Sequence, residues 1–155
     1  MKSKSGFTLV ELVIVVAVIS ILTVIAVVSY GSMSSKADFA KAQTDIRSIQ
    51  KAIDVYKIRT GAYPNTSGSW RQQSSSGDAF IPNLKPTYIS QLPVDKVNSG
   101  LNSYSYRSDG ADYKLLRQRD PSTPLSAVER QNNPLLDPTR TTTAWGYWTP
   151  GAASW

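Results

Sequence analysis

The chain has 155 residues with 17 basic and 11 acidic side chains, a formal net charge of +6, and neither histidine nor cysteine. The missing residue types exclude the usual zinc ligands, imidazole acid–base catalysis, thiol nucleophiles and disulfides. The length suits one modest domain plus an anchoring segment, and the scattered basic residues favour a solvated surface over a nucleic-acid-binding footprint.

The N-terminal part combines a short basic segment with a long apolar run. Lys2 and Lys4 precede Leu12–Val28, which contains no charge, proline or glycine. As a helix this run is about 25 Å long, the lower limit for crossing a bilayer. Extending it to residues 7–30 predicts a single transmembrane helix, with the basic end cytoplasmic and everything after Tyr30 outside.

Two simpler interpretations of the apolar run fit the residues less well. A secretory signal peptide would end in a small-residue cleavage site after the run, yet no Ala-x-Ala follows Val28. A plain uncleaved anchor does not account for Glu11, a carboxylate that lies five residues after Gly6.

The sequence KSKSGFTLVELVIVVAVISIL resembles the class III signal peptide of type IV pilins and of the pseudopilins of type II secretion. The resemblance implies that residues 1–6 are a leader, that prepilin peptidase cleaves after Gly6, and that the new terminus at Phe7 is N-methylated. It also implies an assembly ATPase and an inner-membrane platform protein as partners. Residues 41–66 are similar to the corresponding segment of the major G-type pseudopilin.

Glu11 is expected to act in assembly, because a charge inside a bilayer costs about 2.5 to 3.5 kcal/mol and needs a partner. Cleavage after Gly6 frees the α-amino group of Phe7, four residues before Glu11 and on the same helix face. In a bundle, the amine of an adjacent subunit would serve equally. Since an unpaired member is heavily penalised, we expect the Phe7–Glu11 charge pair to set the register of assembled subunits.

Two departures from the family affect the predicted structure. Many members carry a glycine midway along the apolar segment and a proline near its end, where this chain has Ser20 and Val28. Without proline every backbone donor can stay paired, so we expect a continuous helix. The chain also lacks the disulfide that closes the C-terminal loop of many type IV pilins, so another interaction must hold the C-terminal segment.

The second half of the predicted helix, residues 31–63, is amphipathic. Gly61 and Pro64 are expected to end it. The helix should cover a folded domain through one apolar stripe, whose residues recur at alternating spacings of three and four: Phe39, Ala42, Ile46, Ile49, Ile53 and Tyr56.

Residues 64–155 predict a globular domain with a small antiparallel sheet and long loops. Residues 65–87 are rich in serine, glycine, asparagine and proline and predict a surface loop. Alternating aromatic residues around Asp109–Gly110 predict a hairpin, and residues 144–148 predict a third strand. The proline-rich stretch 120–143 predicts an irregular excursion. The expected fold class is α+β, with a long N-terminal helix packed on the sheet.

Four aspartates form a weak candidate metal site. Asp109 and Asp112, with Asp95 and Asp120, lie in loop-like segments where the resemblance to G-type pseudopilins implies a calcium ion. Their spacing matches no complete calcium-loop pattern, and a turn-forming aspartate explains Asp109 equally well. No cofactor is therefore expected, with calcium at Asp109 and Asp112 as the weaker alternative.

A terminal aromatic cluster is expected to help hold the C-terminal segment. It comprises Trp145, Tyr147, Trp148 and Trp155. Binding of a sugar or a partner is the alternative, but such aromatic residues are more often packed in a core or at a sheet edge.

An enzyme is not expected, because the serines lack a histidine and no acidic pair is placed by its spacing in an evident cleft. We predict a structural subunit of a type IV pilus-like homo-oligomeric helical filament, polymerised through its apolar helix. The alternatives are the major G-type pseudopilin of a type II secretion system, and a DNA-uptake or adhesive pilin. The subunit should first be a single-pass protein in bacterial inner-membrane lipid, and later part of a periplasmic or surface filament.

Overall fold

The computed structural model describes residues 7–131 and 133–155, with the side chains of 26–30 and 32 excepted. The leader predicted for residues 1–6, and with it the cleavage position at Gly6, lies outside the described residues. The chain divides after Ala37 into an N-terminal unit and a globular unit, which begins at Asp38.

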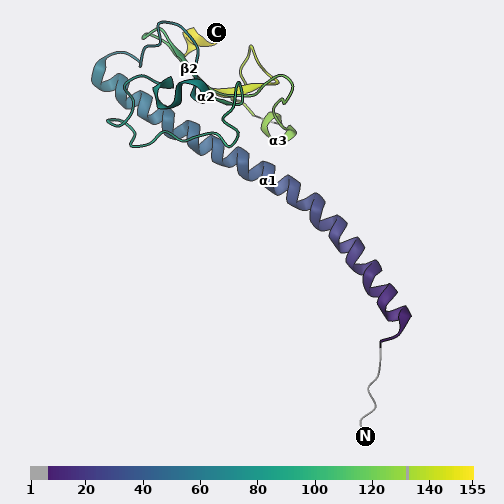
Figure 1. Cartoon of the computed structure of the whole chain (residues 1–155). Coiled ribbons are helices and arrows are strands. Elements are labelled where there is room, and N and C mark those ends of the chain that lie inside the picture. Colours follow the sequence, from purple (N-terminus) through teal and green to yellow (C-terminus); the bar gives the residue numbers. More distant parts are fainter. Residues whose placement is uncertain (1–6, 132) are drawn as a thin grey trace. The chain divides into compact units, whose positions relative to one another are not determined.

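One helix, α1 (Leu9–Thr60), runs through 52 residues without a break (Figure 1). It is helical from Ser20 to Val28, so the continuity predicted from the missing proline is confirmed for the single chain. Gly61 follows the last helical residue with φ of +82°, and its N–H bonds the Lys57 carbonyl at 2.9 Å. This positive φ suits glycine and ends the helix where the sequence predicted.

The globular unit packs the predicted apolar stripe of α1 into its core. Ile46, Ile49 and Ile53 are fully buried, and Phe39 and Tyr56 pack at the edge of the same cluster. The Phe39 ring meets the ring of Trp145 edge-on at a centroid distance of 5.3 Å. Burying an apolar stripe at helical spacing against a sheet provides most of the stability of such a helix.

The sheet has four antiparallel strands in chain order, and the hairpin and the strand at 144–148 are confirmed. Its elements are β1 (Arg71–Gln72), β2 (Ser103–Ser108), β3 (Tyr113–Gln118) and β4 (Ala144–Trp148) (Figure 1). Tyr106 lies opposite Leu115 in the hairpin, and Leu115 lies opposite Tyr147. With α1 packed on this sheet, the fold is α+β, as predicted.

The surface loop predicted for residues 65–87 is wrong in part. Its middle forms strand β1, the short helix α2 (Gln73–Ser76) and the 3-10 turn η1 (Gly77–Phe80). The loop composition misled the prediction because Phe80 and Ile81 are buried in the core, and because β1 gains its backbone partners from β2, about thirty residues later in the chain.

The excursion 120–143 is mostly irregular, as predicted, but contains one helical turn. This turn is α3 (Ala127–Arg130), which is fixed by a capping box between Ser126 and Glu129. A further 3-10 turn, η2 (Pro150–Ala152), follows β4.

None of the helices that the structure describes combines the length and the apolarity needed to cross a membrane. The segment predicted to do so, residues 7–30, includes residues 26–30, whose side chains are outside the description.

Gly146 in β4 lies so close to β3 that a side chain has no room. A Cβ at Gly146 would overlap the main-chain oxygen of Leu115 and come within 2.9 Å of the Leu116 Cα. We expect Gly146→Ala to lower the free energy of unfolding by about 1 to 3 kcal/mol, measured by urea unfolding of the full chain in detergent micelles.

Gly31→Ala is the control for this variant. A Cβ at Gly31 meets nothing within 4 Å, and alanine favours a helix over glycine by up to about 1 kcal/mol. A Gly146→Ala variant as stable as the wild type would contradict the close pairing of β4 with β3.

Candidate functional site

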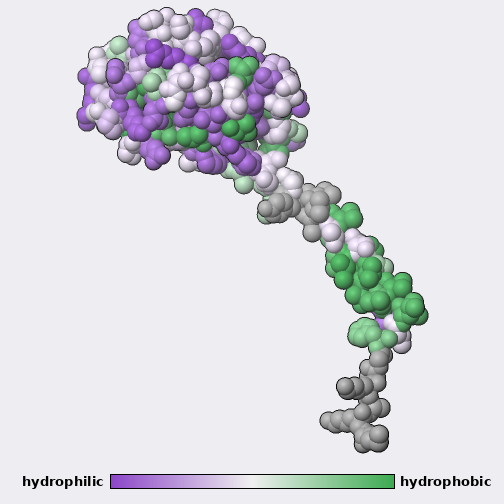
Figure 2. Space-filling view, viewed as in Figure 1, coloured by the Kyte–Doolittle hydropathy of each residue, from purple (hydrophilic) through white to green (hydrophobic). Residues whose placement is uncertain are grey.

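The N-terminal part of α1 exposes apolar side chains all around the helix. Every residue from Phe7 to Ile25 is exposed, with Ile14 at 57% and Leu22 at 60%. Figure 2 shows these hydrophobic side chains gathered over this part of the helix. A helix that is apolar on every face is stable only when other apolar groups cover it, since each Å² removed from water contributes about 25 cal/mol. This segment is therefore the strongest candidate for an assembly surface.

The first turn of α1 is closed by a capping box between Thr8 and Glu11. The Thr8 N–H and Oγ1 donate to Glu11 Oε2 at 2.8 and 2.7 Å, and the Glu11 N–H donates to Thr8 Oγ1 at 3.2 Å. The pattern T-x-x-E is a known start signal for a helix. Sequence reasoning examined Glu11 only as a charge partner and missed Thr8, although this signal was present.

The two residues of the predicted assembly pair, Phe7 and Glu11, lie on either side of Thr8 in the chain. Phe7 is exposed, and Glu11 lies in the first turn of α1, which begins at Leu9. The α-amino group that is expected to bind Glu11 arises only on cleavage after Gly6, so the Phe7–Glu11 pair stays a prediction.

The four aspartates considered for calcium do not converge on a common point. Asp109 Oδ1 accepts the N–H groups of Ala111 and Asp112 at 2.9 and 2.8 Å, which makes it a turn-forming residue. Asp120 accepts the N–H and hydroxyl of Ser122. In the part of the chain that the structure describes, no group of three or more acidic, histidine or cysteine side chains is placed to hold a metal ion.

Asp95, another of the four, is a buried partner of two arginines. Its Oδ2 accepts from Arg117 Nε at 2.7 Å and its Oδ1 from an Arg119 guanidinium nitrogen at 3.1 Å. Burial acts to raise the pKa of Asp95, but the Arg117 charge, the Val97 N–H and Arg119 together outweigh burial and hold that pKa below its usual value. A cation there would have to displace two guanidinium groups.

Arg117 connects this aspartate to α3. Its Nη1 donates to Glu129 Oε1 at 2.6 Å, and the indole N–H of Trp145 donates to the same oxygen at 3.4 Å. Glu129 Oε2 accepts from the backbone N–H and hydroxyl of Ser126. The network joins strands β3 and β4 to α3 and to the loop at Asp95 by charge-assisted hydrogen bonds.

The predicted terminal aromatic cluster is split between the two faces of the sheet. Trp145 is fully buried and Tyr147 packs against the same core. Trp148 lies opposite Lys114 in the β3–β4 register, on the other face. Because alternate residues of a strand point to opposite faces, these rings cannot form one cluster.

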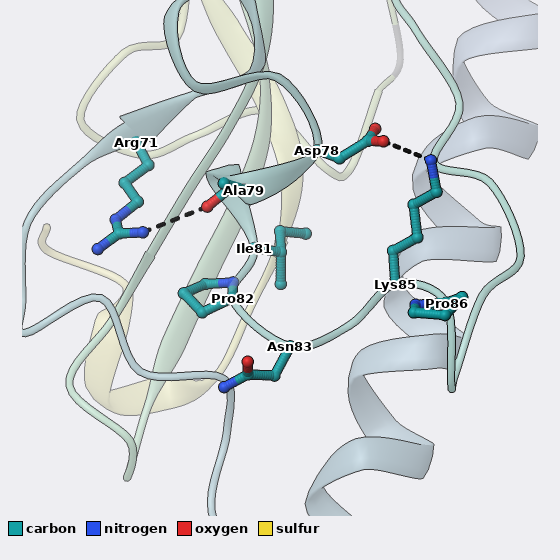
Figure 3. Close-up of a pocket in the computed structure, with 8 residues that line it drawn as sticks. All are labelled: Arg71, Asp78, Ala79, Ile81, Pro82, Asn83, Lys85 and Pro86. Carbon is teal, nitrogen blue, oxygen red and sulfur yellow. Dashed lines mark hydrogen bonds and ion pairs between the residues drawn. The ribbon is translucent and has the colours of Figure 1, made fainter.

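The globular unit also carries one open pocket (Figure 3). The Arg71 guanidinium points to the Ala79 carbonyl at 3.2 Å, and the Lys85 ammonium pairs with Asp78. Both cations are therefore engaged by the pocket wall itself. None of the site residues predicted from the sequence lines it. The lining residues are Arg71, Asp78, Ala79, Ile81, Pro82, Asn83, Lys85 and Pro86.

The buried carboxylates predict that the fold loses stability in acid. Burial acts to raise the pKa of Asp137, but hydrogen bonds from Lys114, Arg140 and the Thr139 N–H outweigh it, so this pKa also lies below its usual value. For Asp95 and Asp137 alike, the stabilisation is present above the unfolded-state pKa of about 3.9 and is lost as pH falls through the lower folded-state pKa.

We therefore expect the free energy of unfolding to fall steadily below about pH 4, measured by urea unfolding of the full chain in micelles at several pH values. Asp95→Asn should show a shallower fall because one of the two groups no longer takes up a proton. A wild-type unfolding free energy that is constant from neutral to acidic pH would contradict both pairings.

Comparison with known proteins identifies the family. The sequence model described as "Type II secretion system (T2SS), protein G" matches residues 29–118, and the one described as "Prokaryotic N-terminal methylation motif" matches residues 1–27. No solved structure gives a significant match to the chain.

Several curated relatives carry the name "Type II secretion system core protein G". The one from Vibrio cholerae is 33% identical over 121 residues, covering 71% of this chain and 75% of the relative. The one from Pseudomonas aeruginosa is 33% identical over 112 residues, covering 70% and 77%. The one from Aeromonas hydrophila is 37% identical over 122 residues, covering 74% and 80%. The family is a structural component of a secretion system and not an enzyme, and this chain belongs to it as a pseudopilin of the type II secretion protein G family.

Proposed function

We propose that the chain is the major pseudopilin of a type II secretion system, a subunit that polymerises into a helical filament through α1. The observation that carries the proposal is the family match over residues 29–118, together with a helix whose first part is apolar on every face. The matches favour this alternative over the surface pilus that was the main prediction from the sequence.

The proposed path begins in the inner membrane. Residues 7–30 would lie in lipid and residues 31–155 on the far side, with the leader 1–6 in the cytoplasm until prepilin peptidase removes it. The match of the N-terminal methylation motif to residues 1–27 supports cleavage after Gly6 and methylation of Phe7. Extraction from lipid requires work, which we assign to an assembly ATPase acting through a platform protein.

In the filament, the apolar segments would cover one another. Both Thr8 bonds go to Oε2 of Glu11, so the carboxylate has a second oxygen, Oε1, to offer to the Phe7 amine of the same or an adjoining subunit. Such a pair in surroundings of low dielectric penalises every other register of the subunits.

Deleting the gene in its own bacterium tests the secretion assignment. Proteins normally secreted to the medium should accumulate in the periplasm, and a plasmid copy of the wild-type gene should restore secretion. Cells that keep normal secretion but lose surface filaments would instead support the pilus subunit, and loss of DNA uptake alone would support the DNA-uptake pilin.

A further inference from the structure

Lys114 is a fully buried lysine near the start of β3, on the sheet face opposite α1. Its neighbours Tyr113 and Leu115 point into the core beneath the helix, so Lys114 points the other way. Its side chain is 0% exposed, as is that of Asp137. Burying an ammonium group costs free energy unless the group is paired and fully hydrogen-bonded. The groups around Lys114 should therefore include the partners that offset this cost.

All three ammonium protons of Lys114 have acceptors. Nζ lies 2.7 Å from Asp137 Oδ1, 3.0 Å from the Ala153 carbonyl oxygen and 3.1 Å from the main-chain oxygen of Trp155. The ammonium also lies 5.4 Å from the centre of the Trp148 ring. Three donors and three oxygens match in number, so the group is saturated.

The segment after β4 is held by the same set of charges. Arg140 Nη1 donates to Asp137 Oδ2 and to the main-chain oxygen of Trp155, both at 2.8 Å. The Arg107 guanidinium lies 4.6 Å from the centre of the Trp155 ring. Lys114 therefore ties three separate parts of the chain together: β3, the loop at 137–140 and residues 149–155.

One carboxylate oxygen and two main-chain oxygens surround the ammonium group, and these are the types of oxygen that calcium also takes as ligands. In this structure Nζ of Lys114 lies between the three oxygens and binds all of them, so a metal ion cannot bind there. Of the aspartates considered for calcium, Asp95 is bound by two arginines, Asp109 by its own turn and Asp120 by Ser122. Among the residues that the structure describes, no three acidic side chains come together to hold a metal ion. The residues present therefore do not fit the calcium ion that the resemblance to G-type pseudopilins implies.

We infer that the Lys114 ammonium is a built-in cation that fastens the segment after β4, in place of a divalent metal or a disulfide, and that the globular unit folds without calcium. Asp137, Arg140 and residues 149–155 lie beyond the stretch 29–118 that the family model matches. Lys114 itself lies within that stretch, so the fastening joins the matched part of the chain to a part that the family model does not match. It concerns folding and stands whether or not the chain acts in secretion.

The test is thermal unfolding of the full chain in detergent micelles, followed by tryptophan fluorescence, in a calcium chelator and in excess calcium chloride. The wild-type midpoint should agree between the two within about 1 °C. Lys114→Met leaves Asp137 buried with less compensation and should unfold about 10 °C lower, again without a calcium effect. Lys51→Met, at an exposed position of α1, is the matched control and should unfold with the wild type.

Two results would overturn the inference. One is a wild-type midpoint that drops by several degrees in chelator and is restored by calcium. The other is a Lys114→Met variant as stable as Lys51→Met. If Lys114→Met is recovered only unfolded, the wild-type comparison in chelator and calcium decides alone, since it requires no variant.

Discussion

Replacing Glu11 by alanine or glutamine is expected to abolish filament assembly while the globular unit stays folded. The two variants separate the two roles of the side chain. Glutamine retains the capping box with Thr8, because its amide oxygen accepts the same hydrogen bonds, whereas it cannot neutralise an amine. If the charge pair with Phe7 governs assembly, Glu11→Gln should fail as completely as Glu11→Ala.

The expected magnitude is large because a buried, unpaired charge costs several kcal/mol, or on the order of a hundredfold or more in assembly. Filaments sheared from cells and sedimented should contain less than a few per cent of the wild-type amount of subunit. Thr8→Ala, which removes the cap but keeps the charge, should cost only about 1 kcal/mol of helix stability and leave measurable filament. Normal filaments from Glu11→Gln would show that capping, and not charge, is what Glu11 provides.

Arg117→Met is expected to be the most destabilising single change in the globular unit among those considered. Arg117 is nearly fully buried between Asp95 and Glu129, and removing one partner of a buried ion pair costs about 3 to 5 kcal/mol because the remaining charge stays unpaired. Asp95 keeps Arg119, so we expect a loss near 3 kcal/mol, at the lower end of that range.

Urea unfolding of the full chain in micelles measures this loss. Arg130→Met is the control, since Arg130 is exposed and lies in the same short helix as Glu129; exposed changes of this kind stay within about 0.5 kcal/mol. A loss below about 1 kcal/mol for Arg117→Met would mean that this buried network contributes no more to stability than exposed ion pairs do.

The elements that have local sequence signals could be predicted from the sequence. The stripe from Phe39 to Tyr56 predicted both the second half of α1 and the face it buries, and Asp109–Gly110 predicted the hairpin. Strand β1 was missed because two residues carry no alternation and their pairing partner lies far along the chain. The T-x-x-E signal of the capping box at Thr8 and Glu11 is present in the sequence, but the prediction considered only the charge of Glu11.

The buried charges could not have been predicted in the same way. In Tyr113–Gln118, the lysine and the arginine fall on opposite faces of a strand, and charged residues are rarely buried unless they are paired. What buries Lys114 and Arg117 is the loop at 137–140, residues 149–155, Asp95 and α3, and only the folded chain shows that these segments meet there. The same long-range contacts make Asp95 an ion-pair partner. Asp109 and Asp120, in contrast, accept hydrogen bonds from residues two or three positions later in their own turns.

The most direct test of the proposed function is the intact mass of the subunit in filaments sheared from cells that overexpress the chain with its secretion system. The proposal predicts one species that begins at Phe7 and carries a single added methyl group. Chains found only in the membrane fraction and still beginning at Met1 would contradict it.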